Sequence, residues 1–156
     1  MHITIVAVGQ KLPAWAQTAV NDYLARFPRD FTVIVKEVKA EARTGGKPVA
    51  QVMAAEAERI ERAVPAGDIL VAMDEHGRDM TTVDFSKKIS AWKNEGCGVT
   101  FIIGGADGLD PALKAKSRMM LRLSSMTLPH AFARVLLTEQ IYRAWSILAN
   151  HPYHRV

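Results

Sequence analysis

The chain has 156 residues, of which 49% are hydrophobic and 23% are charged, and its formal net charge is +4. This length predicts one domain around one core, and the composition excludes a disordered or collagen-like chain. The mild positive charge is compatible with a nucleic acid partner but does not require one. No apolar run reaches the ~20 residues that span a membrane, and the single cysteine, Cys97, cannot form an internal disulfide. We therefore expect a cytoplasmic protein without a secretion signal.

Strands and helices are predicted to alternate along the chain. Runs of β-branched and apolar side chains predict strands. They lie at residues 2–8, 31–38, 68–74, 99–103 and 119–123. Apolar residues at helical spacing predict helices. They lie at residues 13–27, 49–64, 82–94, from 111 onward and at 130–150, and residues 75–78 are expected to form a turn. This order predicts a single α/β domain with a mostly parallel sheet and helices on both faces.

Ligands of such sheets bind at the carboxyl ends of the strands, here near Met73, Gly104 and Ser124. The glycine-rich segment 104–108 lacks the lysine of a phosphate-binding loop and the spacing of a dinucleotide site. Its Asp107, together with Asp110, would repel a phosphate. The segment therefore suits a cation such as the sulfonium of S-adenosylmethionine, or it is simply a tight turn that needs glycine.

Three further segments each allow a structural and a functional interpretation. Residues 40–48 form a basic loop that is either solvated or contacts phosphates. Residues 123–130 are neutral and rich in hydroxyls, and they are either a plain connection or a loop that holds a ligand. The tail 150–156 is either a frayed end or carries functional groups, since its side chains can stack on a base, bind a phosphate or move a proton.

The helix expected at residues 130–150 has more apolar positions than one buried face requires. One apolar stripe contains Leu137, Ile141, Ala144, Trp145 and Leu148, and the other contains Phe132, Val135, Leu136 and Tyr142. Two buried faces in a small domain predict a second partner surface, most simply a homodimer. Glu139 and Arg143 are spaced for an ion pair along the helix.

Five blocks together resemble the ribosomal RNA large subunit methyltransferase H family, small members of the SPOUT class of knotted methyltransferases. They are Val-Ala-Val-Gly-Gln-Lys at 6–11, Tyr-Leu-Ala-Arg-Phe-Pro at 23–28, Phe-Ile-Ile-Gly-Gly-Ala-Asp-Gly at 101–108, Leu-Ser-Ser-Met-Thr-Leu-Pro-His at 123–130, and Tyr-Arg-Ala-Trp-Ser at 142–146 continuing through Asn-His-Pro-Tyr-His-Arg at 150–155. The resemblance covers essentially the whole chain, and the last two blocks are the most specific.

The resemblance implies a C-terminal trefoil knot and methylation of N3 of a pseudouridine in 23S ribosomal RNA, with S-adenosylmethionine as cofactor. It implies no DNA or membrane partner. Because the net charge is modest, we expect the assembled ribosome rather than free RNA to be the substrate. By position, the cofactor would be held by Met73, Gly104, Leu123, Ser124, Ser125, Met126, Thr127 and Leu128. Other members often have leucine at position 73, and some have Pro-Glu in place of Ala106-Asp107.

Within this implied reaction, His154 is the expected base that assists loss of the N3 proton. Arg143 and Arg155 are expected to stabilise negative charge on the target nucleobase or to bind phosphates. Tyr153 is expected to stack on that nucleobase. The cofactor site and the tail could come from different subunits. Two rival functions are a non-catalytic RNA-binding module and a flavodoxin-like mononucleotide binder, which the acidic segment 104–108 disfavours.

Overall fold

The computed structural model describes residues 1–9 and 11–155, which build a five-stranded sheet. The strands are β1 (His2–Val8), β2 (Thr32–Val38), β3 (Ile69–Arg78), β4 (Val99–Ile103) and β5 (Met119–Leu121). The helices are α1 (Ala14–Leu24), α2 (Val49–Ala63), α3 (Thr82–Asn94), α4 (Pro111–Lys116) and α5 (His130–Leu148), with a short 3₁₀ turn at Thr44–Gly46. The predicted alternation of strands and helices is confirmed.

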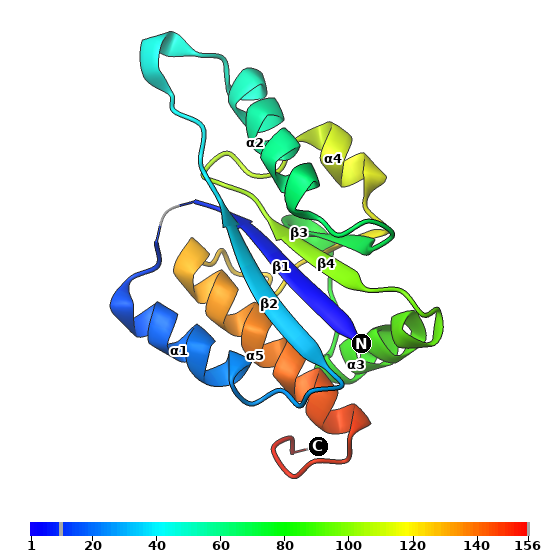
Figure 1. Ribbon diagram of the computed structural model, residues 1–156. Coiled ribbons are helices and arrows are strands. Elements are labelled where there is room, and N and C mark those ends of the chain that lie inside the picture. Colours follow the sequence, from blue (N-terminus) through cyan, green and yellow to red (C-terminus); the bar gives the residue numbers. More distant parts are fainter. Residues whose placement is uncertain (10, 156) are drawn as a thin grey trace.

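The sheet has the order β2-β1-β4-β3-β5, and each neighbouring pair is parallel. Helices α1, α3 and α5 cover one face, and α2 and α4 cover the other (Figure 1). Because both faces are covered, the inner strands are apolar along their length, and all five residues of β4 are buried. Because all the strands run in the same direction, their carboxyl ends lie at one edge of the sheet.

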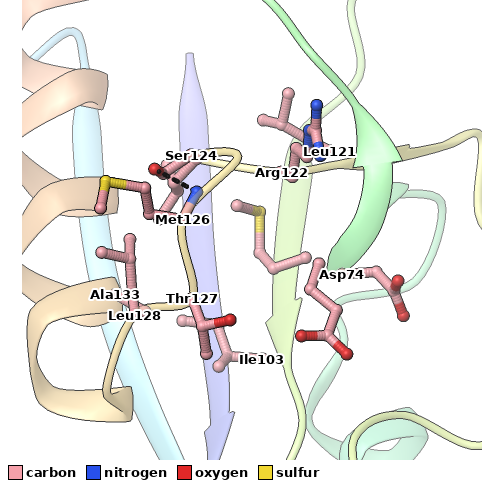
Figure 2. Close-up of a pocket in the computed structure, with 12 residues that line it drawn as sticks. Asp74, Ile103, Leu121, Arg122, Ser124, Met126, Thr127, Leu128 and Ala133 are labelled. Atoms are coloured by element: carbon pink, nitrogen blue, oxygen red, sulfur yellow. Dashed lines mark hydrogen bonds between the residues drawn. The ribbon is translucent and has the colours of Figure 1, made fainter.

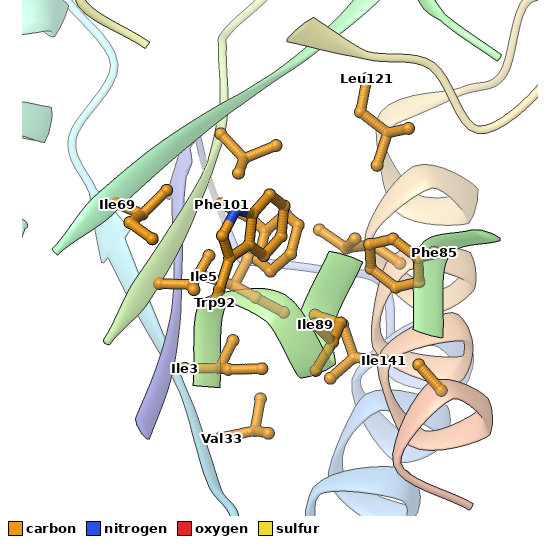
Figure 3. Close-up of a cluster of buried hydrophobic side chains, with 14 of the residues drawn as sticks. Ile3, Ile5, Val33, Ile69, Phe85, Ile89, Trp92, Phe101, Leu121 and Ile141 are labelled. Carbon is orange, nitrogen blue, oxygen red and sulfur yellow. The ribbon is translucent and has the colours of Figure 1, made fainter. Parts of the chain in front are cut away.

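Alternate side chains of β1 enter two cores. Ile3 and Ile5 belong to the larger core beneath α3 and α5, where Phe101 meets Phe85 and Trp92 edge-on (Figure 3). Val6 and Val8 point to the opposite face and pack with side chains of α2 and α4. This two-residue period fixes the strand register, since a slip by one residue would exchange the two faces.

Residues 75–78, expected to be a turn, instead continue β3 past an irregularity in its pairing with β5. Gly77 makes this possible, because a Cβ there would lie 2.7 Å from the carbonyl carbon of Leu121. A side chain at this position would push β5 away. The strand expected at 119–123 ends at Leu121, and the following residues form the loop of the candidate site.

Helix α5 buries Leu137, Ile141 and Ala144 but leaves Phe132 49% and Leu136 37% exposed. The prediction of two apolar faces is therefore confirmed in outline. Two assignments were wrong: Tyr142 is buried among aromatic rings, and Leu148 is 40% exposed. Helices α1 and α5 also end earlier than expected, at Leu24 and Leu148.

No helix within residues 1–9 and 11–155 has the length and apolar character needed to cross a bilayer. The strand order does not by itself establish the trefoil knot, which stays a prediction.

Candidate active site

Two adjoining cavities lie at the carboxyl ends of β3, β4 and β5. The smaller has a volume of about 140 Å³ and is shown in Figure 2. It is lined by Met73, Asp74, Glu75, Ile103, Leu121, Arg122, Leu123, Ser124, Met126, Thr127, Leu128 and Ala133. The larger, of about 600 Å³, shares part of this wall and continues along residues 104–109 to Lys114 and His130. The larger volume falls within the range of small-molecule sites.

The shared wall combines apolar side chains with two carboxylates. Met73, Ile103 and Leu128 supply the apolar surface. Asp74 and Glu75, which follow Met73 along β3, supply the two carboxylates. An apolar slot suits a flat ring, and carboxylates suit a cation. The wall therefore fits the adenosine and sulfonium parts of S-adenosylmethionine, the cofactor that the sequence predicts.

Asp74 is held in its charged form. Burial raises its pKa, but a hydrogen bond from the His76 backbone N–H at 2.8 Å and one from Lys114 Nζ at 3.1 Å outweigh burial. The net pKa lies below the usual value for an aspartate. Asp74 therefore stays ionised at neutral pH as the partner of Lys114, which lines the same cavity.

The loop after β5 supplies most of the predicted cofactor residues. Ser124 Oγ accepts a hydrogen bond of 2.9 Å from the Met126 backbone N–H, which tightens the loop (Figure 2). Thr127 and Leu128 face the cavity from the same loop. Ser125 is exposed and lines neither of the two cavities, so it is the one predicted cofactor residue that the structure does not bring to this wall.

Gly104 must be glycine for a reason internal to its loop. A Cβ at this position would lie 2.6 Å from the carbonyl carbon of Gly108. Asp107 pairs with Arg43 at 2.5 Å, and Asp110 caps α4 by accepting from Ala112 N–H at 3.2 Å. The two aspartates therefore have structural partners, and Asp110 does not belong to the cavity walls.

The basic segment 40–48 is fastened to its surroundings. Besides the Arg43–Asp107 pair, the Glu41 backbone N–H donates to Glu56 on α2 at 3.0 Å, and the Glu41 carboxylate pairs with Arg59 at 3.2 Å. The segment thus joins α2 to the glycine loop, residues 104–108, which lines the larger cavity.

The tail is folded, contrary to the alternative of a frayed end. Asn150 adopts a left-handed backbone with φ 54°, which asparagine tolerates, and turns the chain back toward α5. The Tyr153 hydroxyl lies 3.0 Å from that of Tyr23 on α1 and donates to Glu139 at 3.1 Å. Arg143 also binds Glu139, at 2.6 Å, and covers the Tyr153 ring at 5.0 Å. The predicted Glu139–Arg143 pair is confirmed.

These contacts restrict what Tyr153 can do. Burial, followed by its hydrogen bond with Tyr23 and the charge of Glu139, raises the pKa of Tyr153 well above its ordinary value. Tyr153 therefore stays protonated at neutral pH and does not act as a base. Arg155 is exposed at the end of the described tail.

Ser146 binds His154. Its Oγ donates to the His151 carbonyl at 3.0 Å and lies 2.8 Å from His154 Nδ1. A hydroxyl has one proton, so Oγ must accept from Nδ1–H. The proton of the neutral ring is then on Nδ1, and Nε2 is the basic nitrogen.

One chain does not bring the tail to the cavities. The cavities adjoin the first turn of α5, whereas Tyr153 contacts Glu139 at the middle of the helix and His154 contacts Ser146 near its end. A helix of 19 residues is ~28 Å long, and Figure 1 shows the tail at the far end of α5. The predicted cofactor and catalytic residues thus form two separate groups within one subunit.

Sequence reasoning did not single out Glu75, Ile103, His130 and Ala133 as cavity residues. Glu75 and Ile103 could have been found, because they directly follow or end strands whose carboxyl ends were predicted to hold the ligand. Ala133 could not have been found, because its position at the cavity depends on how α5 packs. His130 could not have been found either, because its spacing from other residues is not typical of a ligand site.

A family model described as "Predicted SPOUT methyltransferase" matches residues 1–154. The ribosomal RNA large subunit methyltransferase H of Ralstonia pickettii (strain 12J) is 53% identical over 156 residues, which is 100% of both chains. That of Bordetella avium (strain 197N) is 54% identical over 155 residues, or 99% of each chain. A solved structure described as a "probable methylase family protein" from Haemophilus influenzae Rd KW20 has the same fold, with TM-score 0.61 at 15% identity, over 99% of this chain and 70% of that one.

The glycine loop (104–108), the hydroxyl-rich loop (123–130) and the tail (150–156) thus occur in a chain that matches these relatives over nearly its full length. The chain belongs to the SPOUT methyltransferase family, among the ribosomal RNA large subunit methyltransferase H proteins.

Proposed function

We propose that this protein methylates N3 of a pseudouridine in 23S ribosomal RNA, acting as a homodimer on the assembled ribosome in the cytoplasm. The observation that carries the proposal is a cavity fitted to S-adenosylmethionine in a chain 53% identical, over its full length, to a ribosomal RNA large subunit methyltransferase. The modest net charge of +4 favours the ribosome over free RNA, because a small basic protein gains little affinity from phosphates alone.

The cofactor, when bound, supplies an electrophilic methyl group on a sulfonium. Met73 and Leu128 would hold its apolar part, and the backbone at Gly104 and at residues 123–127 would approach its polar groups. Asp74, paired with Lys114, would lie beside the bound cofactor in the same cavity. These residues act by positioning, which is the main requirement of an in-line displacement at carbon.

In the proposed mechanism His154 removes the proton from N3. Its Nε2 is the basic nitrogen because Ser146 fixes the proton on Nδ1. The nitrogen that His154 has deprotonated would accept the methyl group that the bound cofactor supplies. A positioned base of this kind contributes ~10²–10⁴-fold.

The other tail residues would bind the RNA. Tyr153 is protonated, and the guanidinium groups of Arg143 and Arg26 lie 5.0 and 5.8 Å from its ring centroid, so a target base would stack on this ring in place of one of them. Arg155 is exposed and suited to a phosphate or a base carbonyl. Arg143 is neutralised by Glu139, so its role is to hold Tyr153 rather than to supply a free charge.

The active site needs two subunits, since ~24 Å of α5 separates His130 at the cavity from Ser146, which holds the proposed base His154. The exposed side chains Trp15 and Phe132, whose ring centroids are 4.9 Å apart on α1 and α5, provide an apolar surface for a second copy. An antiparallel pairing of the two α5 helices would bring each tail to the partner's cavity.

The test is methyl transfer from radiolabelled S-adenosylmethionine to ribosomes that lack the modification. The proposal predicts label in 23S RNA that digestion and mass spectrometry identify as N3-methylpseudouridine. It also predicts faster labelling of ribosomes than of free 23S RNA. Ribosome binding without labelling would instead support the non-catalytic RNA-binding module.

A further inference from the structure

Arg26, just beyond the end of α1, lies against the aromatic rings that hold the tail. Its guanidinium carbon is 4.8 Å from the ring centroid of Tyr23, 5.7 Å from that of Tyr142 and 5.8 Å from that of Tyr153. A guanidinium within about 6 Å of a ring centroid is attracted by the electrons of the ring face. The Arg26 side chain is also 38% exposed. A cation in contact with solvent therefore stands beside the ring on which the target base is proposed to stack.

The rings that Arg26 contacts are fixed by directed hydrogen bonds. The Glu139 carboxylate can only accept, and the Tyr153 hydroxyl donates to it at 3.1 Å. The Tyr23 hydroxyl, 3.0 Å from that of Tyr153, must then be the donor of the second bond. Tyr142 packs edge-on against Tyr153, with ring centroids 4.7 Å apart. Arg26 thus rests on a fixed aromatic surface built from α1, α5 and the tail.

Arg26 is held less firmly than Arg143, the other guanidinium beside Tyr153. Arg143 contacts Glu139 Oε1 from Nε at 2.8 Å and from Nη2 at 2.6 Å, and the Glu139 side chain is only 13% exposed. Arg26 contacts Asp22 from Nη2 at 2.8 Å, and the Asp22 side chain is 60% exposed. Ion pairs between exposed side chains are weak, since water competes for both partners. A phosphate can therefore replace Asp22, whereas Arg143 stays with Glu139.

We propose that Arg26 binds a phosphate of the ribosomal RNA beside the target nucleotide, and that it thereby leaves the ring of Tyr153 open to the target base. This inference rests on the proposed function, because it needs RNA at the tail. Arginine suits the task, since its planar group binds two phosphate oxygens at once. The end of α1 and the tail of the same subunit then form one RNA-binding surface.

Three variants separate a phosphate contact from a structural ion pair. Arg26→Gln removes the charge, whereas Arg26→Lys keeps it. Asp22→Asn breaks the ion pair but leaves the cation free for RNA. The matched control is Arg62→Gln, since Arg62 pairs with Glu58 four residues earlier on α2 and its side chain is 78% exposed. Both glutamine variants change the net charge equally, but α2 covers the opposite face of the sheet (Figure 1).

The experiment is equilibrium binding of each variant to ribosomes that lack the modification, over a series of salt concentrations, with the melting temperature measured in parallel. Loss of one phosphate contact predicts about tenfold weaker binding of Arg26→Gln at low salt. It also predicts a slope of log affinity against log salt that is shallower by about one. Arg26→Lys should keep the wild-type slope and bind within about threefold of wild type. Asp22→Asn should bind at least as tightly as wild type, and Arg62→Gln should match it.

Wild-type affinity and slope in Arg26→Gln would overturn the inference. Equal weakening in Asp22→Asn and Arg26→Gln would overturn it too, because the important contact would then be the ion pair itself. Wild type that binds ribosomes without methylating them would contradict the proposed function, while the binding of Arg26→Gln would still decide the inference.

Discussion

Ser146 Oγ lies 2.8 Å from His154 Nδ1 and also binds the His151 carbonyl and the His154 backbone N–H. Ser146 is fully buried in α5, so this arrangement is set by the helix and not by the exposed tail. The serine thereby determines both the position of the imidazole and the nitrogen that is basic.

Ser146→Ala is expected to lower kcat by about tenfold, since the imidazole loses its orienting hydrogen bond and its preferred tautomer. The affinity for S-adenosylmethionine should not change, because Ser146 is fully buried and lines neither cavity. Single-turnover methylation and calorimetry measure the two quantities. Ser117→Ala, which removes a comparable bond to a helix carbonyl in α4, is the control. Unchanged kcat in Ser146→Ala would contradict the role given to His154.

Thr127→Trp should abolish cofactor binding by filling the smaller cavity, with a loss of about a hundredfold or more from overpacking. Thr127 is exposed, so the substitution should not unfold the chain. Ala66→Trp, in the exposed turn before β3 at the opposite edge of the sheet, is the matched control. Calorimetric titration compares the two. A bulky residue at Gly104 would be a poorer test, because it would deform the loop backbone.

Trp15→Glu is expected to convert the dimer to monomers. A carboxylate placed against Phe132 would be buried without a partner at the interface, which should weaken association about a hundredfold. Sedimentation velocity measures the mass. Val49→Glu changes an equally exposed apolar residue on α2, on the opposite face, and should leave the mass unchanged. A Trp15→Glu variant that stays dimeric would place the interface elsewhere.

Asp74 should make stability depend on pH. Its pKa in the folded state lies below the value near 3.9 of an unfolded aspartate, so its charged form stabilises the fold above that pH. This contribution is lost as the pH falls through the lower, folded pKa. Asp74→Asn should therefore unfold at lower denaturant concentration than wild type at pH 7, and the difference should shrink below about pH 4. A difference that is constant with pH would contradict the ion pair with Lys114.

Much of the fold could be predicted from the sequence because its signals are local. Continuous apolar runs predicted β1 and β4, and helical spacing predicted α3, whose first turn is capped by the Asp84 N–H donating to Thr81 Oγ1. The Glu139–Arg143 pair follows from helical spacing alone. The extension of β3 could not be predicted in this way, because Gly77 is explained only by the close approach of Leu121.

The site was predictable in part. Parallel topology places Met73 and Gly104 at one edge, and the loop 123–128 follows the adjacent strand. The link from Glu37 through Arg134 to His130 could not be predicted, because it joins β2 and α5 through tertiary packing. The folded tail depends likewise on Tyr23, which lies on α1.

The claim that each active site takes its cofactor residues from one subunit and its tail from the other can be tested by mixing two inactive variants. Thr127→Trp and His154→Ala each disable both sites of a homodimer. After mixing in equal amounts and subunit exchange, half of the dimers are heterodimers, each with one intact site. The account predicts recovery of about a quarter of wild-type methylation of ribosomes. No recovery, with exchange verified by mass, would contradict a shared active site.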